Sequence, residues 1–253
     1  MFNLKWRVAV ISWASSWLWK QMAQWLAWQW ADLVILARRY DRLEEFKKEL
    51  ESQYHINVLA IQCDVTSTED INNAAKLSEE TFWKVDILLN CAWASKDSWI
   101  LEMTDEEWDF TISTDQTSVF KMTRAFANIM KKNNYGRIIN IASMYGLVWN
   151  MEIGTIAYHS SKGWVVNFTR ACAAELAKYN ITCNAICPWY FETELTRRTL
   201  ETKEFKEYMK NTVPMKRYGK EWELNAWAIF LASDEASYVT WAILPIDGWY
   251  TCI

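Results

Sequence analysis

Residues 136–162 read GRIINIASMYGLVWNMEIGTIAYHSSK, and the rest of the chain is best understood from this segment. It opens with a short apolar run that predicts a buried strand, and the run is followed by a hydroxyl side chain, Ser143. After a loop, Tyr158 and Lys162 stand four residues apart, so on a helix their side chains share one face. A phenol is a poor base at neutral pH, and a nearby ammonium favours its ionised form. We interpret the pair as a proton-transfer device, with Ser143 as a hydrogen-bond partner of the same substrate oxygen.

The spacing of Tyr158 and Lys162 carries little weight alone. In a chain with 11 Tyr, one such pair is expected by chance about as often as not. The position of the pair, after an apolar strand followed by Ser143, is what gives it meaning.

The composition excludes several classes of protein. A length of 253 residues suits one large α/β domain. A net charge of -4 argues against nucleic acid or anionic membrane as the main partner. The six cysteines form no CxxC pair, so we expect a reduced, cytoplasmic protein. We expect no signal peptide, and no apolar run is long enough to cross a membrane.

Apolar strand-like runs alternate with segments of helical spacing along the whole chain. We expect strands at 7–12, 32–37, 57–62, 85–90, 136–143, 181–187 and 242–247. We expect helices up to residue 29 and at 41–54, 67–82, 104–132, 155–178, 194–212 and 221–233. Parallel strands need crossover helices, so the order predicts an α/β fold, a single-domain doubly wound parallel sheet of Rossmann type with helices on both faces.

Polar side chains stand at or just beyond the ends of the expected strands. They are Ser12, Arg38, Asp64, Asn90, Ser143 and Cys187. In open parallel sheets, ligands bind beyond the carboxyl ends of the strands. The suspected functional residues therefore converge on one edge of the sheet.

These features resemble those of the short-chain dehydrogenase/reductase family over nearly the whole chain. The resemblance rests on SWASSWLW (12–19), Asp64-Val65, NCAW (90–93), Ser143 with Tyr158 and Lys162, and Pro188-Trp189 with Thr193. The stretches SMYG, FETELT and ILPIDG are most similar to those of gluconate 5-dehydrogenase-like reductases.

The resemblance implies a mechanism. A nicotinamide cofactor would exchange hydride with a carbonyl or alcohol carbon, while Tyr158 gives or takes the proton on the oxygen. Lys162 would lower the pKa of that phenol and hold the nicotinamide ribose, and Ser143 would orient the oxygen. The implied cofactor contacts are Ser12, Trp13, Ser15, Ser16, Trp17, Leu18, Arg38, Arg39, Asp64, Val65, Asn90, Ala92, Tyr158, Lys162, Pro188 and Thr193. Residues 189–212 would form a substrate lid, in which Arg197 and Arg198 could meet a carboxylate.

The second expected strand is followed by Arg38 and Arg39, with no acidic residue where an NAD enzyme would hold the adenosine ribose. A guanidinium suits a 2′-phosphate by charge and by bidentate geometry. We therefore favour NADP(H) over NAD(H).

Tryptophan stands at many positions where glycine would be expected. The chain has 18 Trp and only 6 Gly, about a third of the ordinary glycine content. Trp13, Trp17 and Trp19 occupy the three glycines of the family's phosphate loop, where an indole offers neither the tight turn nor the close backbone approach. Random drift would not choose one residue type so often, which indicates engineering or an error in the sequence as written.

Two further residues depart from the family pattern. Asp115 stands where the family usually has asparagine, and its charge near Lys162 would weaken the lowering of the Tyr158 pKa. Cys91 replaces the second asparagine of an Asn-Asn-Ala-Gly motif, a change that small uncharged residues tolerate. His55 and His159 have no partners at metal-ligand spacing, so we expect no metal site.

The sequence thus predicts an NADP(H)-dependent oxidoreductase that interconverts a ketone and a secondary alcohol on a small sugar acid, such as gluconate and 5-ketogluconate. One alternative is a 3-oxoacyl-carrier-protein reductase. Another is an inactive scaffold whose cofactor site is blocked by the tryptophans. The resemblance also implies a homotetramer formed by the helices at 105–132 and 155–178.

Overall fold

A computed structural model describes residues 2–14, 17–149, 153–192 and 196–252, without the side chains of Trp17, Thr199 and Glu221. Its centre is a seven-stranded sheet in the order β3-β2-β1-β4-β5-β6-β7, with every neighbouring pair parallel. The strands are β1 (Val8–Ser12), β2 (Asp32–Ala37), β3 (Val58–Gln62), β4 (Ile87–Asn90), β5 (Gly136–Ile141), β6 (Ile181–Pro188) and β7 (Ile243–Ile246). The predicted doubly wound parallel sheet is confirmed.

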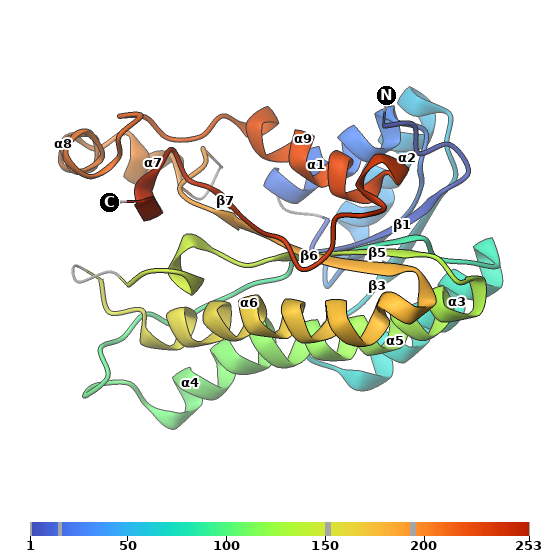
Figure 1. Ribbon diagram of the computed structural model, residues 1–253, viewed down its shortest axis with the longest axis horizontal. Coiled ribbons are helices and arrows are strands. Elements are labelled where there is room, and N and C mark those ends of the chain that lie inside the picture. The colour runs from blue at the N-terminus through green and yellow to red at the C-terminus, as the bar shows by residue number, and fades with distance from the viewer. Residues whose placement is uncertain (1, 15–16, 150–152, 193–195, 253) are drawn as a thin grey trace.

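Helices cover both faces of the sheet (Figure 1). One face carries α1 (Trp17–Trp28), α2 (Tyr40–Tyr54) and α9 (Glu221–Ala232), and the other carries α3 (Thr68–Phe82), α4 (Asp105–Ile112), α5 (Ser118–Asn133) and α6 (Ile156–Leu176). Two shorter helices, α7 (Arg197–Leu200) and α8 (Lys203–Thr212), lie beyond one end of the sheet. In the part of the chain that is described, no helix combines the length and apolar character needed to cross a bilayer.

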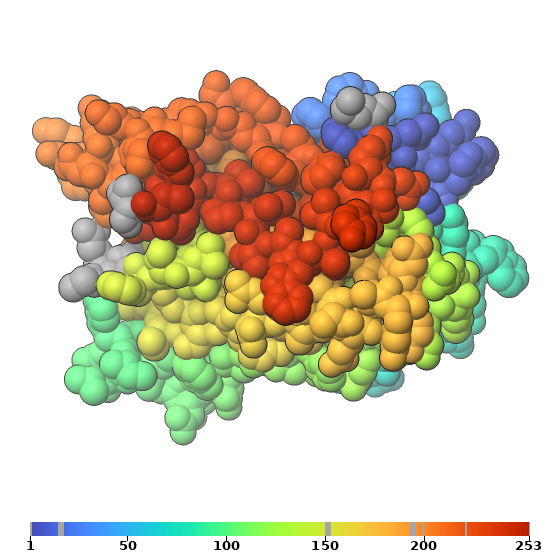
Figure 2. Space-filling model, in the orientation of Figure 1, coloured from blue at the N-terminus to red at the C-terminus, as the bar shows by residue number. Residues whose placement is uncertain are grey.

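The sheet is sandwiched, so its inner strands are buried on both faces. Every residue of β1, β4 and β5 is buried, which is why these strands read as continuous apolar runs rather than alternating ones. The strand order reverses between β1 and β4, and in such sheets the ligand crevice opens at this reversal. The C-terminal segment, red in Figure 2, lies across the middle of one face of the molecule, between orange and gold segments.

Two expected helices differ from the structure. The single helix expected at 104–132 is α4 and α5 joined by a π-helical turn, η1 (Ser113–Thr117), which places Asp115 in the wide turn. Such turns arise where one extra residue is inserted, a feature that hydrophobic spacing does not reveal. The helix expected at 194–212 is divided into α7 and α8, because the Thr202 side chain caps a new helix by accepting a hydrogen bond from the Phe205 amide.

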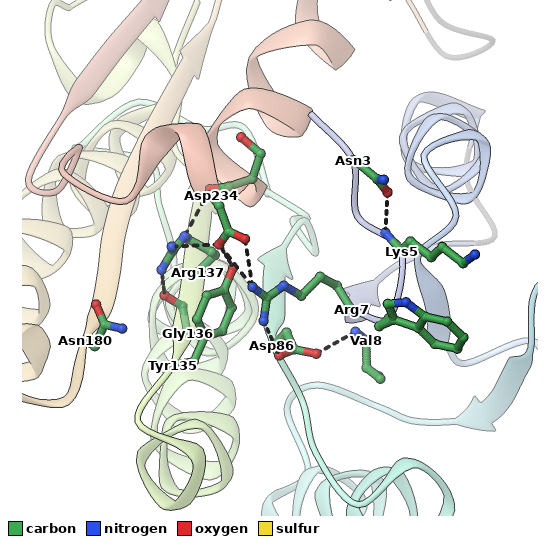
Figure 3. A network of polar contacts seen from close by, with 12 residues as sticks. Asn3, Lys5, Arg7, Val8, Asp86, Tyr135, Gly136, Arg137, Asn180 and Asp234 are labelled. Atoms are coloured by element: carbon green, nitrogen blue, oxygen red, sulfur yellow. Dashed lines mark hydrogen bonds and ion pairs between the residues drawn. The ribbon is translucent and has the colours of Figure 1, made fainter. Parts of the chain in front are cut away.

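A polar network ties together the amino-terminal ends of β1, β4 and β5 (Figure 3). The Asp86 carboxylate accepts hydrogen bonds from the Val8 amide (2.9 Å) and from Arg7 (3.2 Å), and it also pairs with Lys84 (3.0 Å). Arg7 and Arg137 both reach the Asp234 carboxylate, at 2.9 and 3.4 Å. The network therefore fixes the strand ends opposite the ligand crevice.

Tryptophan occupies left-handed backbone positions in this fold. Among the described residues other than glycine, eleven have positive φ, and six of these are tryptophan. They are Trp6, Trp13, Trp30, Trp83, Trp241 and Trp249, with φ between 61° and 78°. A bulky side chain in this region is strained by about 1–2 kcal/mol, because its Cβ crowds the following carbonyl.

Trp83 offers a direct measurement of this strain. It caps the C-terminus of α3 with φ 62°, and its side chain is 84% exposed, so packing compensates little. We expect Trp83→Gly to raise the free energy of unfolding by about 1 kcal/mol in urea denaturation. Trp108→Gly is the matched control: Trp108 lies within α4, where glycine lowers helix stability, so this change should act in the opposite direction. A loss of stability in both variants would contradict the strain at Trp83.

Candidate active site

The fold brings Ser143, Tyr158 and Lys162 together. Ser143 lies two residues beyond the end of β5, and its buried hydroxyl accepts a hydrogen bond from the Tyr145 amide (3.2 Å). Tyr158 and Lys162 come from the first two turns of α6, and the Ser143 and Tyr158 hydroxyls are hydrogen-bonded. The Lys162 ammonium lies 5.4 Å from the centre of the Tyr158 ring. One phenol, one hydroxyl and one ammonium therefore face a single point beyond the carboxyl edge of the sheet.

Lys162 is buried and held by one hydrogen bond and one ion pair. Its Nζ donates to the Ile141 carbonyl at 3.2 Å and lies 3.5 Å from Oδ2 of Asp115. Asp115 is fully buried in the π-helical turn, and its Oδ1 accepts from the Ala94 amide at 2.7 Å. The aspartate thus links Lys162 to the segment that follows β4, as its expected position near Lys162 implied.

The electrostatics at Tyr158 differ from the expectation. Burial raises the pKa of the Tyr158 phenol, and the charge of Asp115 raises it further, while the hydrogen bond with Ser143 opposes them. The pKa of Tyr158 is therefore raised rather than lowered as expected, chiefly because the phenol is buried, while the Lys162 charge is paired with Asp115. At neutral pH Tyr158 is a protonated phenol, which can donate a proton to a substrate oxygen.

The effect of Asp115 on Tyr158 can be measured without any ligand. We expect Asp115→Asn to lower the pKa of Tyr158, because the change removes a negative charge that disfavours the phenolate. The asparagine Oδ1 can still accept from the Ala94 amide, so the local fold is kept. The measurement is the pH titration of ring-labelled tyrosine by ¹³C NMR, with the Tyr158 signal assigned through Tyr158→Phe. Asp97→Asn is the control, since Asp97 is exposed and acts on Tyr158 more weakly; an equal shift in both variants would contradict a special role for Asp115.

The polar residues at the ends of β1 and β4 tie the strands together. The Ser12 hydroxyl accepts from the Cys91 and Ala92 amides at 2.9 and 3.1 Å. The Asn90 side chain donates to Asn140 Oδ1 at 2.8 Å and to the Thr123 hydroxyl at 3.1 Å. Sequence reasoning missed Asn140 and Thr123, although Asn140 is a polar residue inside an otherwise apolar strand. Their positions make Ser12 and Asn90 supports of the crevice floor.

An open groove lies beyond the ends of β2 and β3. It has a volume of about 1020 Å³ and is lined by Arg38, Gln62, Asp64, Thr68, Glu69, Asp70, Asn72, Asn73 and Lys76. Arg39 is exposed but does not line the groove, and Val65 is buried beside it. Oδ1 of Asp64 accepts from the Thr66 amide and hydroxyl, which fixes the turn after β3. Of the two expected arginines, Arg38 is the one that lines the groove.

The crevice between β1 and β4 is filled by two indoles. Trp13 follows β1 and Trp93 follows β4, and their ring centres are 6.4 Å apart. The Trp93 ring in turn lies 5.7 Å from the Tyr158 ring. The indoles thus span the crevice at the reversal of strand order, where a dinucleotide would cross the sheet. The residues present do not fit a nicotinamide dinucleotide at this point.

The rest of the expected phosphate loop is only partly described. Ser15, Ser16 and Thr193 lie outside the described residues, as does the side chain of Trp17. Leu18 is partly buried against the core, and Trp19 is 4% exposed inside it.

The expected lid is lined with aromatic side chains. Pro188 ends β6, and the following Trp189 belongs to a cluster with Tyr145 and Met209 against which Tyr158 also packs. The Tyr145 ring stacks on His159 at 4.5 Å, so His159 does not face Tyr158. Arg197 forms an ion pair with Glu192 (3.0 Å) within the lid. Arg197 is thus already paired, and both Arg197 and Arg198 are exposed.

Known proteins resemble this chain along nearly its whole length. Residues 19–251 match the family described as enoyl-(acyl carrier protein) reductase. The chain is 34% identical over 251 residues to galactitol 2-dehydrogenase (L-tagatose-forming) of Cereibacter sphaeroides, covering 99% of this chain and 97% of that protein. It is 31% identical over 246 residues to a 3-oxoacyl-(acyl-carrier-protein) reductase of Vibrio cholerae, covering 97% and 98%. The solved structure of a gluconate 5-dehydrogenase from Burkholderia cenocepacia in complex with NADP and tartrate superposes with a TM-score of 0.94 at 27% identity, covering 100% and 98%.

Proposed function

The chain belongs to the short-chain dehydrogenase/reductase family of oxidoreductases, and on that premise we propose that it interconverts a ketone and a secondary alcohol on a small sugar acid. The family uses nicotinamide cofactors. The observation that carries the proposal is the convergence of Ser143, Tyr158 and Lys162 on one point at the carboxyl edge of the sheet.

The protonated phenol of Tyr158 favours reduction of the ketone. A ketone oxygen that becomes an alcohol gains a proton, and Tyr158 can supply it. The Ser143 hydroxyl, hydrogen-bonded to the same phenol, would orient the substrate oxygen and stabilise its developing charge. Lys162, held by Ile141 and Asp115, would keep a positive charge next to the proton donor.

Support for a sugar acid and for NADP(H) comes from two directions. A similar solved structure, named a gluconate 5-dehydrogenase, contains NADP and tartrate, and a 34% identical relative is named for a sugar alcohol. In this chain Arg38 directly follows β2 and lines the groove, where its positive charge favours a 2′-phosphate, although the groove also carries the carboxylates of Asp64, Glu69 and Asp70. Gluconate and 5-ketogluconate are the substrate pair we propose.

A 3-oxoacyl thioester is the second candidate substrate. Relatives of that name cover the same length of chain, and the cluster of Tyr145, Trp189 and Met209 presents an apolar surface next to Tyr158 that could receive an acyl chain.

We also propose a cytoplasmic homotetramer. The exposed aromatic side chains Phe110 and Phe120 on α4 and α5 support an interface along these helices.

The test is an assay of NADPH absorbance with 5-ketogluconate and, in parallel, a 3-oxoacyl thioester. Because indoles fill the crevice, the assay uses the variant Trp13→Gly, Trp17→Gly, Trp19→Gly and Trp93→Gly, with the same variant carrying Tyr158→Phe as the control. We expect NADPH consumption with 5-ketogluconate that the control lacks. Consumption only with the thioester would move the assignment to the second candidate, and equal rates in both proteins would defeat the catalytic assignment.

A further inference from the structure

Tryptophan occupies backbone positions with positive φ, which glycine usually occupies in other proteins. Six of the eleven described non-glycine residues with positive φ are tryptophan, whereas only one of the six glycines, Gly248, has a positive φ. Asparagine and histidine, which also occur among the eleven, are ordinary occupants of this region, but tryptophan is not. The left-handed positions of this fold thus carry the residue type least suited to them.

Packing does not explain these tryptophans. Trp6, Trp30, Trp83, Trp241 and Trp249 combine a positive φ with side chains that are 52–84% exposed. Each of these residues therefore has both a strained backbone and a large exposed apolar side chain, and burial offsets neither unfavourable contribution to stability. Glycine at these sites would remove both costs.

Tryptophan in place of glycine also explains why the crevice between β1 and β4 is blocked. Trp13 has φ 61° directly after β1, and Trp93 follows β4 on the other side of the reversal in strand order. The centres of the two rings are 6.4 Å apart, and the Trp93 ring also lies against Tyr158. Both rings therefore lie across the path that a dinucleotide would take. With glycine at both positions, neither indole would stand on this path, and the backbone at position 13 could approach a phosphate closely.

We infer that the cell that makes this protein inserts glycine at seven of the tryptophan positions. They are Trp6, Trp13, Trp30, Trp83, Trp93, Trp241 and Trp249. The reason we infer is that one codon, read as tryptophan in the sequence, is translated as glycine by that cell. One codon with a changed meaning accounts for the excess of tryptophan, the shortage of glycine and the choice of left-handed sites together. Trp17 and Trp19, in the first turn of α1 and in the same sequence motif as Trp13, belong to the same set by the sequence pattern. Trp108, in the middle of α4 with ordinary helical backbone, remains tryptophan.

Peptide mass spectrometry of the protein purified from its source cell tests the inference. Trypsin releases residues 8–20, with Trp13, Trp17 and Trp19, and residues 85–96, with Trp93. The expected masses are lower by three and by one tryptophan-to-glycine differences, while fragment ions still show tryptophan at position 108. Tryptophan at positions 13 and 93 in these peptides would overturn the inference.

Cofactor binding gives a second readout, which rests on the proposed function. Three proteins are titrated with NADPH by calorimetry: the chain with every tryptophan, the variant with glycine at 13, 17, 19 and 93, and a control with glycine at 6, 83, 241 and 249. We expect heat of binding only from the second, because the control relieves strain but leaves the crevice filled. If the second variant does not fold, judged by circular dichroism, the variant combining both sets replaces it.

Equal NADPH affinity of the all-tryptophan chain and the crevice variant would overturn the inference that the indoles block the site. Absence of binding in every folded variant would also overturn it. Binding of NADPH by the crevice variant without turnover of 5-ketogluconate or the thioester would count against the proposed substrates alone.

Discussion

Replacing Tyr158 by phenylalanine should lower kcat by about a hundredfold to ten-thousandfold, the range typical for loss of a positioned proton donor. The change removes one oxygen and keeps the ring, so the contact of Tyr158 with Tyr145 can persist. KM should change little, because the lost interaction is made mainly as the proton transfers. The measurement is steady-state ketone reduction in the crevice-opened variant.

Tyr238→Phe is the matched control for Tyr158→Phe. Tyr238 is fully exposed and follows α9 in the sequence, so loss of its hydroxyl should leave kcat unchanged. Ser143→Ala should fall between the two variants, since it removes a hydrogen bond to the reacting oxygen but no proton donor. Full activity of Tyr158→Phe would show that another group supplies the proton.

Replacing Asp86 by alanine should lower the free energy of unfolding by about 3 kcal/mol. Asp86 is 3% exposed, and its carboxylate accepts from the Val8 amide and from Arg7 (Figure 3). It also pairs with Lys84. Its removal leaves a buried backbone amide without its acceptor, takes the carboxylate partner from Lys84 and leaves Arg7 with Asp234 alone. The midpoint of urea denaturation should fall without a change in slope, because the surface exposed on unfolding stays the same.

Glu49→Ala is the matched control for Asp86→Ala. Glu49 also pairs with a lysine, Lys20 at 2.6 Å, but both side chains are well exposed. An exposed ion pair contributes between about 0 and 1 kcal/mol, because water already solvates both charges. Equal losses in the two variants would mean that burial does not set the contribution of Asp86.

The sequence alone determined the sheet and most of its elements. Apolar runs identified all seven strands to within about two residues. The signal is strongest for β1, β4 and β5, because strands buried on both faces are mostly apolar throughout. Capping residues identified the starts of α3 and α4. The Ser67 side chain accepts a hydrogen bond from the Asp70 amide, and the Thr104 side chain accepts one from the Glu107 amide, as expected. The convergence of Ser143, Tyr158 and Lys162 also followed, since helical spacing and strand ends are local properties.

Only the tertiary structure decided the electrostatics and the state of the crevice. Spacing put Lys162 beside Tyr158, but the three-dimensional fold buried the phenol and paired the Lys162 charge with Asp115 in a π-helical turn. Burial, and after it the charge of Asp115, raises the pKa of Tyr158 instead of lowering it. The meeting of Trp13 and Trp93 was likewise invisible, because the two residues stand 80 positions apart in the sequence. Local patterns fix what each segment forms, whereas charge pairing and occlusion depend on distances between segments that only the packed chain sets.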